Sequence, residues 1–250
     1  MEAGLVSIIT PTYNCAEFIG ETIDSVQSQT YISWEMIIVD DCSTDNTKEI
    51  VEKYSKNDKR IKYYCMISQS GAAKARTRAM QLAQGEYIAF LDSDDLWISD
   101  KLEKQLTFMK QHDVAFTCTA YEQIDEEAKL LNRIVKTVPK VNYNRVLLDC
   151  PIGNSTVMYS VKKMGKFEVP NIRKRNDDAL WLQMLKKEEY IYGMRNVLMR
   201  YRIRQNSISS NKLKLIKYHW ILYRDIEHLS ILRSIFHIAY WCVIKILRIK

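Results

Sequence analysis

Three aspartates follow directly after a strand-like apolar run near the middle of the chain. Residues 86–91 have the length and composition of a buried strand, and the next four residues read DSDD, with aspartate at positions 92, 94 and 95. Neighbouring carboxylates repel one another and are costly to desolvate, so a positive charge usually accompanies them. Mg²⁺ or Mn²⁺ meets this need, because such sites combine one or two carboxylates with substrate phosphates. A solvated acidic turn is the alternative, since Asp-x-Asp is a short pattern.

The elements that must position these carboxylates alternate between strand and helix over the first hundred residues. Apolar, β-branched runs predict strands at residues 5–10, 35–39, 61–66 and 86–91. Helical spacing predicts helices at residues 17–29, from about residue 45 and at residues 72–83, and Ser43 or Thr44 could cap the second of them. This order predicts an α/β fold with a mostly parallel, doubly wound sheet and flanking helices.

After residue 97 the pattern is looser. We expect a helix at residues 98–110, antiparallel strands at 114–124 and 130–138, a strand at 153–159, a helix at 177–187 and a last strand at 197–202. A small antiparallel part would then lie beside the parallel sheet.

Three of the predicted strands end in residues suited to a nucleotide diphosphate. The first runs into Pro11 and Tyr13, the second into Asp40 and Asp41, and the fourth into the DSDD cluster. Parallel sheets bind ligands beyond the carboxyl ends of their strands. A ring can stack on a base, a carboxylate can accept from a base or a ribose, and a cation can hold a diphosphate. The chain lacks both G-x-G-x-x-G and a P-loop, so basic side chains such as Arg76 would have to contact phosphate.

Five segments form an ordered set: VSIITPTYN, IIVDDCSTD, SGAAKARTRA, GEYIAFLDSDDLW and RNDDALWLQML. In this order they resemble the inverting glycosyltransferases of family 2, which have the Rossmann-like GT-A fold, and the resemblance covers about residues 5–210. It implies transfer of a sugar, of the hexosyl type, from a nucleotide-diphosphate donor to a hydroxyl of a glycan or lipid-linked acceptor. It also implies Mn²⁺ or Mg²⁺ as cofactor, and it favours UDP as the nucleotide and a role in cell-surface polysaccharide synthesis.

The resemblance further implies roles for single residues. It assigns donor-nucleotide contacts to Pro11, Tyr13, Asp41, Arg76 and Asp92, a metal-ligand role to Asp94 and the role of catalytic base to Asp177. Asp178 follows immediately, so the base could lie one position further along. Candidates for the sugar or acceptor pocket are Trp97, Asn154 and Asp178. For Trp97 a place in the core is the alternative, and the loop around Asn154 could be an ordinary one.

Three positions depart from the family pattern. After the arginine at position 76 the family often has Asn-x-Gly, whereas this chain has Thr77, Arg78 and Ala79. The residue before the base is often glutamate, whereas this chain has Asn176. Near the last strand the family often has Arg-x-His, whereas this chain reads Arg202-Ile203-Arg204, so a histidine ligand is not expected there. Arg204 could pair with the diphosphate directly, or it could be a solvated basic residue.

Composition indicates a folded intracellular protein. A chain of 250 residues with 47% hydrophobic and 27% charged residues can bury a sizeable core, which excludes a disordered chain. Its six cysteines are scattered without a C-x-x-C pair, which favours reduced thiols over disulfides or a zinc site. A predicted strand within the first ten residues leaves no room for a signal peptide. We therefore expect a cytoplasmic protein, peripheral on the cytoplasmic face of the membrane.

The positive charge of the chain comes from its tail. Residues 200–250 contain 11 Lys/Arg and 2 Asp/Glu, whereas the whole chain has a net charge of +7. We expect a catalytic domain at residues 1–210 and basic, aromatic-rich amphipathic helices at residues 211–250. The longest apolar stretch, residues 235–244, is too short for a bilayer span of about 20 residues. Such helices fit a membrane surface, and packing on the catalytic domain or in an oligomer is the alternative.

Two other functional classes remain open on the sequence alone. A nucleotidyltransferase also couples a nucleotide to acidic metal ligands, but it would need a basic, Gly-rich loop after the first strand, where the chain reads PTYNCAEF. A non-enzymatic membrane- or nucleic-acid-binding module would depend on the tail. The sequence has no known nucleic-acid motif, so we expect no nucleic-acid partner.

Overall fold

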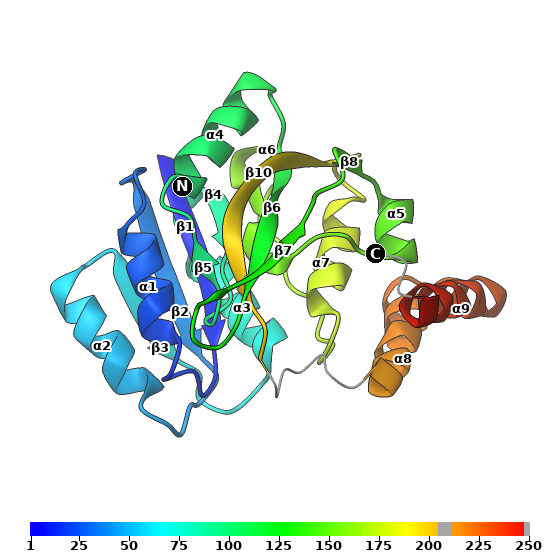
Figure 1. Cartoon of the computed structure of the whole chain (residues 1–250), viewed down its shortest axis with the longest axis horizontal. Coiled ribbons are helices and arrows are strands. Elements are labelled where there is room, and N and C mark those ends of the chain that lie inside the picture. Colours follow the sequence, from blue (N-terminus) through cyan, green and yellow to red (C-terminus); the bar gives the residue numbers. More distant parts are fainter. Residues whose placement is uncertain (205–211, 248–250) are drawn as a thin grey trace.

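The computed structural model describes residues 1–204 and 212–247, and for residues 212–214 and 245–247 only the backbone (Figure 1). Four parallel strands form the first half of its central sheet. They are β1 (Glu2–Thr12), β2 (Trp34–Asp40), β3 (Ile61–Cys65) and β4 (Gly85–Phe90), in the spatial order β3-β2-β1-β4. Helices α1 (Ile19–Gln27), α2 (Thr47–Asn57) and α3 (Ala72–Leu82) connect them. All seven residues of β2 are buried, as expected for a strand covered on both faces.

The second half of the sheet is mixed. Strand β9 (Met158–Ser160) runs antiparallel between β4 and β6 (Phe116–Ile124), and β10 (Ile191–Arg202) runs parallel to β6. Strands β5 (Leu96–Trp97) and β8 (Lys140–Val141) pair with β10, and β7 (Leu130–Val135) pairs with β6, all antiparallel. The main path through the sheet is β3-β2-β1-β4-β9-β6-β10-β5.

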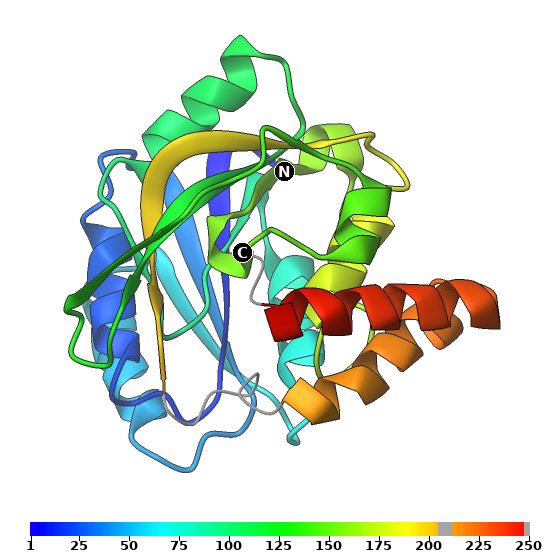
Figure 2. The ribbon, with the colours of Figure 1, turned by 45° about the vertical axis from the view of Figure 1, so that its right-hand side comes forward.

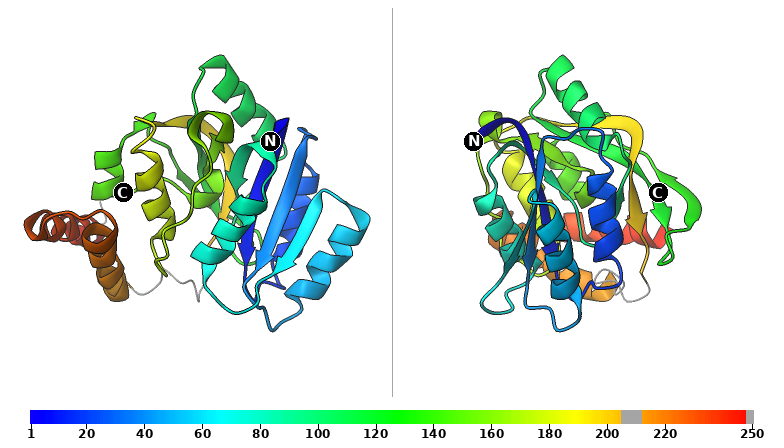
Figure 3. Two further views of the ribbon diagram at one scale, coloured as in Figure 1. Left: turned by 180° about the vertical axis from the view of Figure 1, so that it is seen from behind. Right: turned by 90° about the vertical axis from the view of Figure 1, so that its left-hand side faces the viewer.

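Helices cover both faces of this sheet (Figure 3). Apolar residues of α1 and of α4 (Lys101–Gln111) belong to one hydrophobic core, which includes Ile23 and Leu106. Helices α3, α5 (Tyr143–Leu148), α6 (Val161–Met164) and α7 (Asn176–Met184) contribute to a second core on the other face. A short 3₁₀ turn, η1 (Asn154–Thr156), leads into β9. The carboxyl ends of β1, β2 and β4 therefore meet at one edge, with α7 on the second core.

The expected α/β class with a mostly parallel sheet is confirmed, although several element boundaries differ. The last strand, expected at residues 197–202, already begins at Ile191. The strand expected at residues 153–159 is divided into η1 and β9, because Asn154 and Ser155 turn toward the aspartates after β4. The helix expected from residue 45 begins at Thr47. Ser43 does not cap it, because its hydroxyl donates to Asp40 Oδ1 at 2.7 Å.

Helices at the carboxyl end of the described chain pack on the side of the molecule away from α1 and α2 (Figure 2). They are α8 (Lys212–Ile221), the π turn η2 (Leu222–Ile226) and α9 (Ile231–Leu247). Leu222 and Tyr223 belong to the same core as α7. The expected domain boundary near residue 210 falls within residues 205–211, outside the described residues. In the described chain, no helix combines the length and the hydropathy that a membrane span requires.

Candidate active site

Strand β1 ends in the residues predicted to contact a base. Tyr13 follows β1 and is 45% exposed, so its ring is available to a planar ligand. Pro11 is buried within β1, where it lies opposite Val39 of β2. The sequence places this proline after the strand, and the structure corrects that placement, because β1 continues to pair with β2 through Thr12.

Asp41, after the end of β2, is hydrogen-bonded to the residues that precede α3. Its two carboxylate oxygens accept from the backbone N–H groups of Ser70 at 2.6 Å and Gly71 at 2.7 Å. The residue is 4% exposed and borders a hollow of about 440 Å³ that is also lined by residues 69–73 and 171–173. Each carboxylate oxygen has a second lone pair, so Asp41 can still accept a hydrogen bond from a ligand.

Asp92 and Asp94, after β4, have basic partners and keep partly exposed side chains. Asp92 Oδ1 accepts from Arg76 Nη2 at 2.9 Å and from Asn154 Nδ2 at 2.8 Å. Asp94 Oδ2 lies 3.1 Å from Arg204 Nη1. The arginine that stands where the family often has histidine therefore contacts the predicted metal ligand. Asn154, one of the acceptor-side candidates, is 9% exposed and contacts Asp92.

Asp95, the third aspartate of the turn, is buried. Its Oδ2 accepts from the Ser155 hydroxyl at 2.5 Å and its Oδ1 from the backbone N–H of Arg202 at 3.1 Å. Burial, and then the neighbouring Asp94 and Asp92 carboxylates, raise the pKa of Asp95 well above its ordinary range. Asp95 therefore fixes the turn, and Asp92 and Asp94 are the carboxylates that a ligand can reach.

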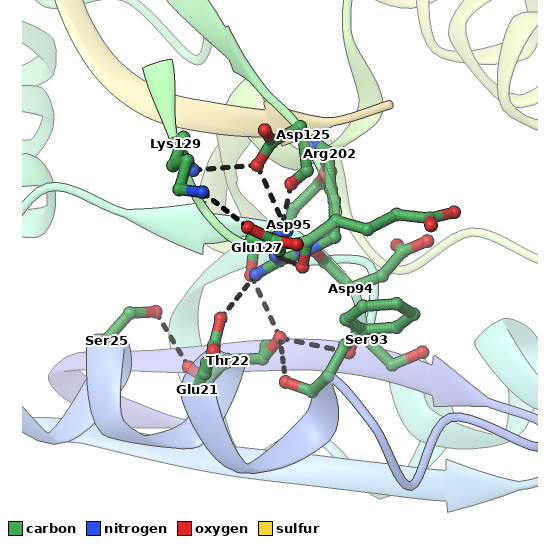
Figure 4. Close-up of polar contacts among 12 residues, drawn as sticks. Glu21, Thr22, Ser25, Ser93, Asp94, Asp95, Asp125, Glu127, Lys129 and Arg202 are labelled. Carbon is green, nitrogen blue, oxygen red and sulfur yellow. Dashed lines mark hydrogen bonds and ion pairs between the residues drawn. The ribbon is translucent and has the colours of Figure 1, made fainter. Parts of the chain in front are cut away.

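The guanidinium of Arg202 joins three separate elements at this turn (Figure 4). Its side chain is fully buried and donates to the backbone oxygens of Asp94 at 2.9 Å, Asp125 at 3.3 Å and Glu126 at 2.7 Å. It also donates to Glu21 Oε2 of α1 at 2.5 Å. No local sequence pattern indicates this role of Arg202, because its partners lie at least 76 residues away in the chain.

Arg76 connects the acidic turn to the start of α7. Its guanidinium, on a side chain that is 5% exposed, donates to Asn176 Oδ1 and to Asp92 Oδ1. Burial raises the pKa of Asp92, the Arg76 cation lowers it, and the Asp94 and Asp177 carboxylates raise it further. The predicted metal ligand and the predicted base therefore share one electrostatic environment. Asn176, which departs from the family pattern, supplies the oxygen that Arg76 binds.

The two aspartates of α7 differ in their surroundings. Asp178 is 4% exposed and pairs with Arg175 Nη1 at 2.8 Å. Burial raises the pKa of Asp178 to about 6, an effect that the Arg175 cation partly offsets. Asp177 is partly exposed, and its carboxylate has no hydrogen-bond or ion-pair partner within residues 1–204 and 212–247. Asp178 is therefore occupied by an ion pair, and Asp177 is the more accessible of the two carboxylates.

Trp97 lies in the core and not in an open sugar pocket. Its side chain is 4% exposed and packs with residues of α1 and α4. The indole N–H donates to the backbone oxygen of Ser155 at 2.8 Å, and Lys101 Nζ lies 4.2 Å from the centroid of the indole ring. The prediction of a sugar-facing Trp97 is corrected for this reason: pairing of β5 with β10 turns the indole inward.

The aspartates after β4 provide few ligands for a metal ion. Within the described part of the chain, no group of three or more His, Cys, Asp or Glu side chains could hold one. Asp92 and Asp94 are the two accessible carboxylates, and Mg²⁺-type sites use one or two carboxylates together with substrate phosphates. The residues therefore fit a cation that binds together with a nucleotide diphosphate.

Solved structures share this architecture. S. aureus TarS, solved as residues 1–349 in complex with UDP-GlcNAc, superimposes with a TM-score of 0.70 over 94% of this chain and 70% of that chain, at 21% sequence identity. The likeness establishes the fold. The protein has the GT-A fold of glycosyltransferases, as the sequence motifs implied.

Sequence comparison then gives the family. The family model described as Glycosyl transferase family 2 matches residues 7–169, and the chain belongs to this family. Bacillus subtilis TuaG, a glycosyltransferase named for teichuronic acid biosynthesis, is 45% identical over 241 residues, 96% of this chain and 94% of that protein. Escherichia coli WfgD, named as a UDP-Glc:α-D-GlcNAc-diphosphoundecaprenol β-1,3-glucosyltransferase, is 38% identical over 98% of this chain and 95% of its own length. The protein is a glycosyltransferase, and not a nucleotidyltransferase or a non-enzymatic binding module.

Proposed function

We propose that this glycosyltransferase transfers a sugar, with inversion, from a UDP-sugar to a hydroxyl of a lipid-linked or glycan acceptor in cell-surface polysaccharide synthesis. The observation that carries the proposal is the Asp177 carboxylate, which has no hydrogen-bond or ion-pair partner among the described residues. It follows Asn176, whose side chain is bonded through Arg76 to Asp92 of the acidic turn. The names of WfgD and TuaG support a UDP-sugar donor, a diphosphoundecaprenol-linked acceptor and a polysaccharide product.

Donor binding would use the residues at the carboxyl ends of the strands. Tyr13 would stack on the base next to Pro11, and Asp41 would accept a hydrogen bond from the base. Asp92 would accept from the ribose. Arg76 is already bonded to Asp92, so it would act near the nucleotide mainly through its positive charge.

Asp94 would hold Mn²⁺ or Mg²⁺ together with the donor diphosphate. A cation bound there supplies Lewis-acid neutralisation of the departing nucleotide diphosphate. Arg204, now 3.1 Å from Asp94 Oδ2, would then exchange this carboxylate for a diphosphate oxygen, because a guanidinium binds phosphate with good geometry.

Asp177 would act as the general base. Inversion requires the acceptor hydroxyl to attack on the side opposite the leaving group, and a hydroxyl is a weak nucleophile until its proton is removed. A carboxylate within hydrogen-bond reach takes up this proton and typically contributes about 10²–10⁴-fold to the rate. Asp178 would stay in its ion pair with Arg175 throughout.

The test of this proposal is binding and hydrolysis of a panel of UDP-, GDP- and dTDP-sugars, measured by calorimetry and by release of nucleotide. We expect affinity for the UDP series that is strongest with Mn²⁺ and falls in EDTA. Turnover should increase when a diphosphoundecaprenol-linked sugar is added. Affinity confined to another nucleotide series, or none at all with folded protein, would refute the donor assignment.

Replacing Asp94 by alanine should remove the metal-dependent part of UDP binding. We expect affinity in Mn²⁺ to fall by about ten-fold or more, which corresponds to ~1.4 kcal/mol, and affinity in EDTA to stay unchanged. Titration calorimetry with UDP in both buffers measures the two values. Asp113→Ala is the matched control, because its side chain is 93% exposed and pairs with Lys163, away from the acidic turn. A response to Mn²⁺ that survives in Asp94→Ala contradicts the metal assignment.

We also propose that α9 rests on the cytoplasmic surface of the membrane, where a lipid-linked acceptor is confined. One side of α9 presents apolar side chains that are 38–81% exposed: Ile231, Leu232, Ile235, Phe236, Tyr240 and Val243. Exposed apolar stripes of this kind on a helix are typical of membrane-surface contacts.

Phe236→Glu should release the protein from vesicles of phosphatidylglycerol and phosphatidylcholine. We expect the partition coefficient in a sedimentation assay to fall about ten-fold or more, because burial of a phenylalanine side chain contributes roughly 1.5–3 kcal/mol. Leu131→Glu on β7, another exposed apolar residue, is the control and should bind as the wild type does. If both variants bind equally, α9 is not the contact.

A further inference from the structure

Arg175, at the start of α7, has a backbone conformation that contacts with neighbouring residues must stabilise. It precedes the first residue of the helix with φ +65°, in the left-handed region that is unfavourable for a non-glycine residue. One end of its guanidinium pairs with Asp178, three residues along, at 2.8 Å. Burial opposes the charge on Arg175, but Asp178 and then Asp177 raise its pKa above the ordinary value. The same cation is therefore attracted to both aspartates.

His219, from the carboxyl-terminal helices, holds the other end of this guanidinium. Arg175 Nη2 lies 2.9 Å from His219 Nε2. Since a guanidinium can only donate, the imidazole nitrogen must be the acceptor and the ring must be neutral there. His219 lies on α8, is 1% exposed and is 44 residues away from Arg175 in the sequence.

The imidazole of His219 is fixed from two sides. Its centroid lies 4.5 Å from that of Trp241 on α9 and 5.7 Å from that of Tyr223 on η2. The Tyr223 hydroxyl donates to the Leu147 oxygen of α5 at 2.8 Å, and Trp241 is 4% exposed. The ring is therefore packed between η2 and α9 at the point where it meets Arg175.

We propose that His219 is a positioning residue for catalysis: by accepting from Arg175 it keeps the guanidinium on Asp178, so that Asp177 stays unpaired and able to take up a proton. The inference rests on the proposed function, in which Asp177 is the base. Without the imidazole, the guanidinium would be free to turn toward Asp177, only two residues away. The carboxyl-terminal helices would thus belong to the catalytic unit, besides any contact that they make with a membrane.

The test is the kinetics of His219→Leu in the full-length chain, with the donor and acceptor identified in the assay above. We expect kcat to fall about ten-fold or more, because general-base catalysis depends on an unpaired base. The KM for the donor and the Kd for UDP should stay within about two-fold of wild type, since neither depends on proton removal. His219→Gln should restore kcat, because its amide oxygen can accept from Arg175. His112→Leu, at the exposed end of α4, is the control and should leave all values unchanged.

A double-mutant cycle with Arg175→Gln separates this role from general support of the fold. If released Arg175 masks Asp177, then His219→Leu should lower kcat no further once the guanidinium is gone. Should His219→Leu fail to fold, His219→Asn takes its place, because its shorter amide cannot reach Arg175. Wild-type kcat in the His219 variant overturns the inference, and so does a loss of UDP binding as large as the loss of kcat. In either case an inactive Asp177→Asn would leave the base assignment standing. An active Asp177→Asn would instead overturn the base assignment of the proposed function.

Discussion

Replacing Asp177 by asparagine is expected to lower kcat about 10²–10⁴-fold and to leave the affinity for UDP nearly unchanged, because the amide keeps the shape of the side chain but cannot accept a proton. The structure supports this expectation through the different surroundings of the two neighbouring aspartates. Asp177 is partly exposed, whereas Asp178 is buried in an ion pair with Arg175. Steady-state kinetics with a saturating donor, together with UDP calorimetry, measures both quantities.

Asp178→Asn is the matched control for this experiment. It should lower the melting temperature, because it leaves the largely buried Arg175 cation without its ion-pair partner. Any fall in kcat should be smaller than for Asp177→Asn when both are compared below their melting temperatures. If Asp178→Asn folds but is inactive and Asp177→Asn is active, the catalytic base is Asp178 and not Asp177.

Replacing Arg202 by methionine should lower the free energy of unfolding by about 3–5 kcal/mol, the usual cost of removing one partner from a buried charged network. Three backbone oxygens, those of Asp94, Asp125 and Glu126, would lose the buried guanidinium that donates to them. Glu21 contributes less to the loss, because its side chain is 52% exposed and can be rehydrated. The turn that carries Asp94 would loosen as well, so UDP binding in Mn²⁺ should weaken.

Arg200→Met, two residues earlier on β10, provides the comparison. Arg200 Nε lies 2.8 Å from Glu122 Oε1 of β6, and both side chains are partly exposed. Exposed pairs of this kind contribute about 0–1 kcal/mol, so this variant should unfold close to wild type. Urea titration followed by tryptophan fluorescence gives the two free energies. An equal fall in the free energy of unfolding in both variants would show that the burial of Arg202 does not increase its contribution to stability.

The parallel half of the sheet could be predicted because each element carries its own local signal. The apolar runs at residues 5–10 and 35–39 have strand length, and turn or helix patterns separate them. Topology then places Tyr13, Asp41 and Asp92 at one edge without further information. For the same reason the residues at the strand ends could be proposed as site residues from the sequence.

Contacts across the fold were not accessible in this way. Arg202 meets Asp94 across 108 residues and His219 meets Arg175 across 44, and no local pattern records such pairings. A tryptophan after an acidic turn can face a ligand or the core, and the choice for Trp97 depends on how β5 pairs with β10. The polar stretch around Ser155 looked like part of a strand because its partners, the aspartates after β4, lie about sixty residues earlier.

The position of β10 has a consequence for how the protein folds. It is the last strand of the described chain, yet it lies inside the sheet between β6 and β5, and its end anchors the acidic turn. During synthesis the first four strands can assemble while β6 still lacks this neighbour. Pairings between distant segments form slowly because a long loop must close first. The edge of the sheet that carries the candidate site would thus form last. Until β10 pairs with β6, the unpaired edge of β6 would be exposed to aggregation.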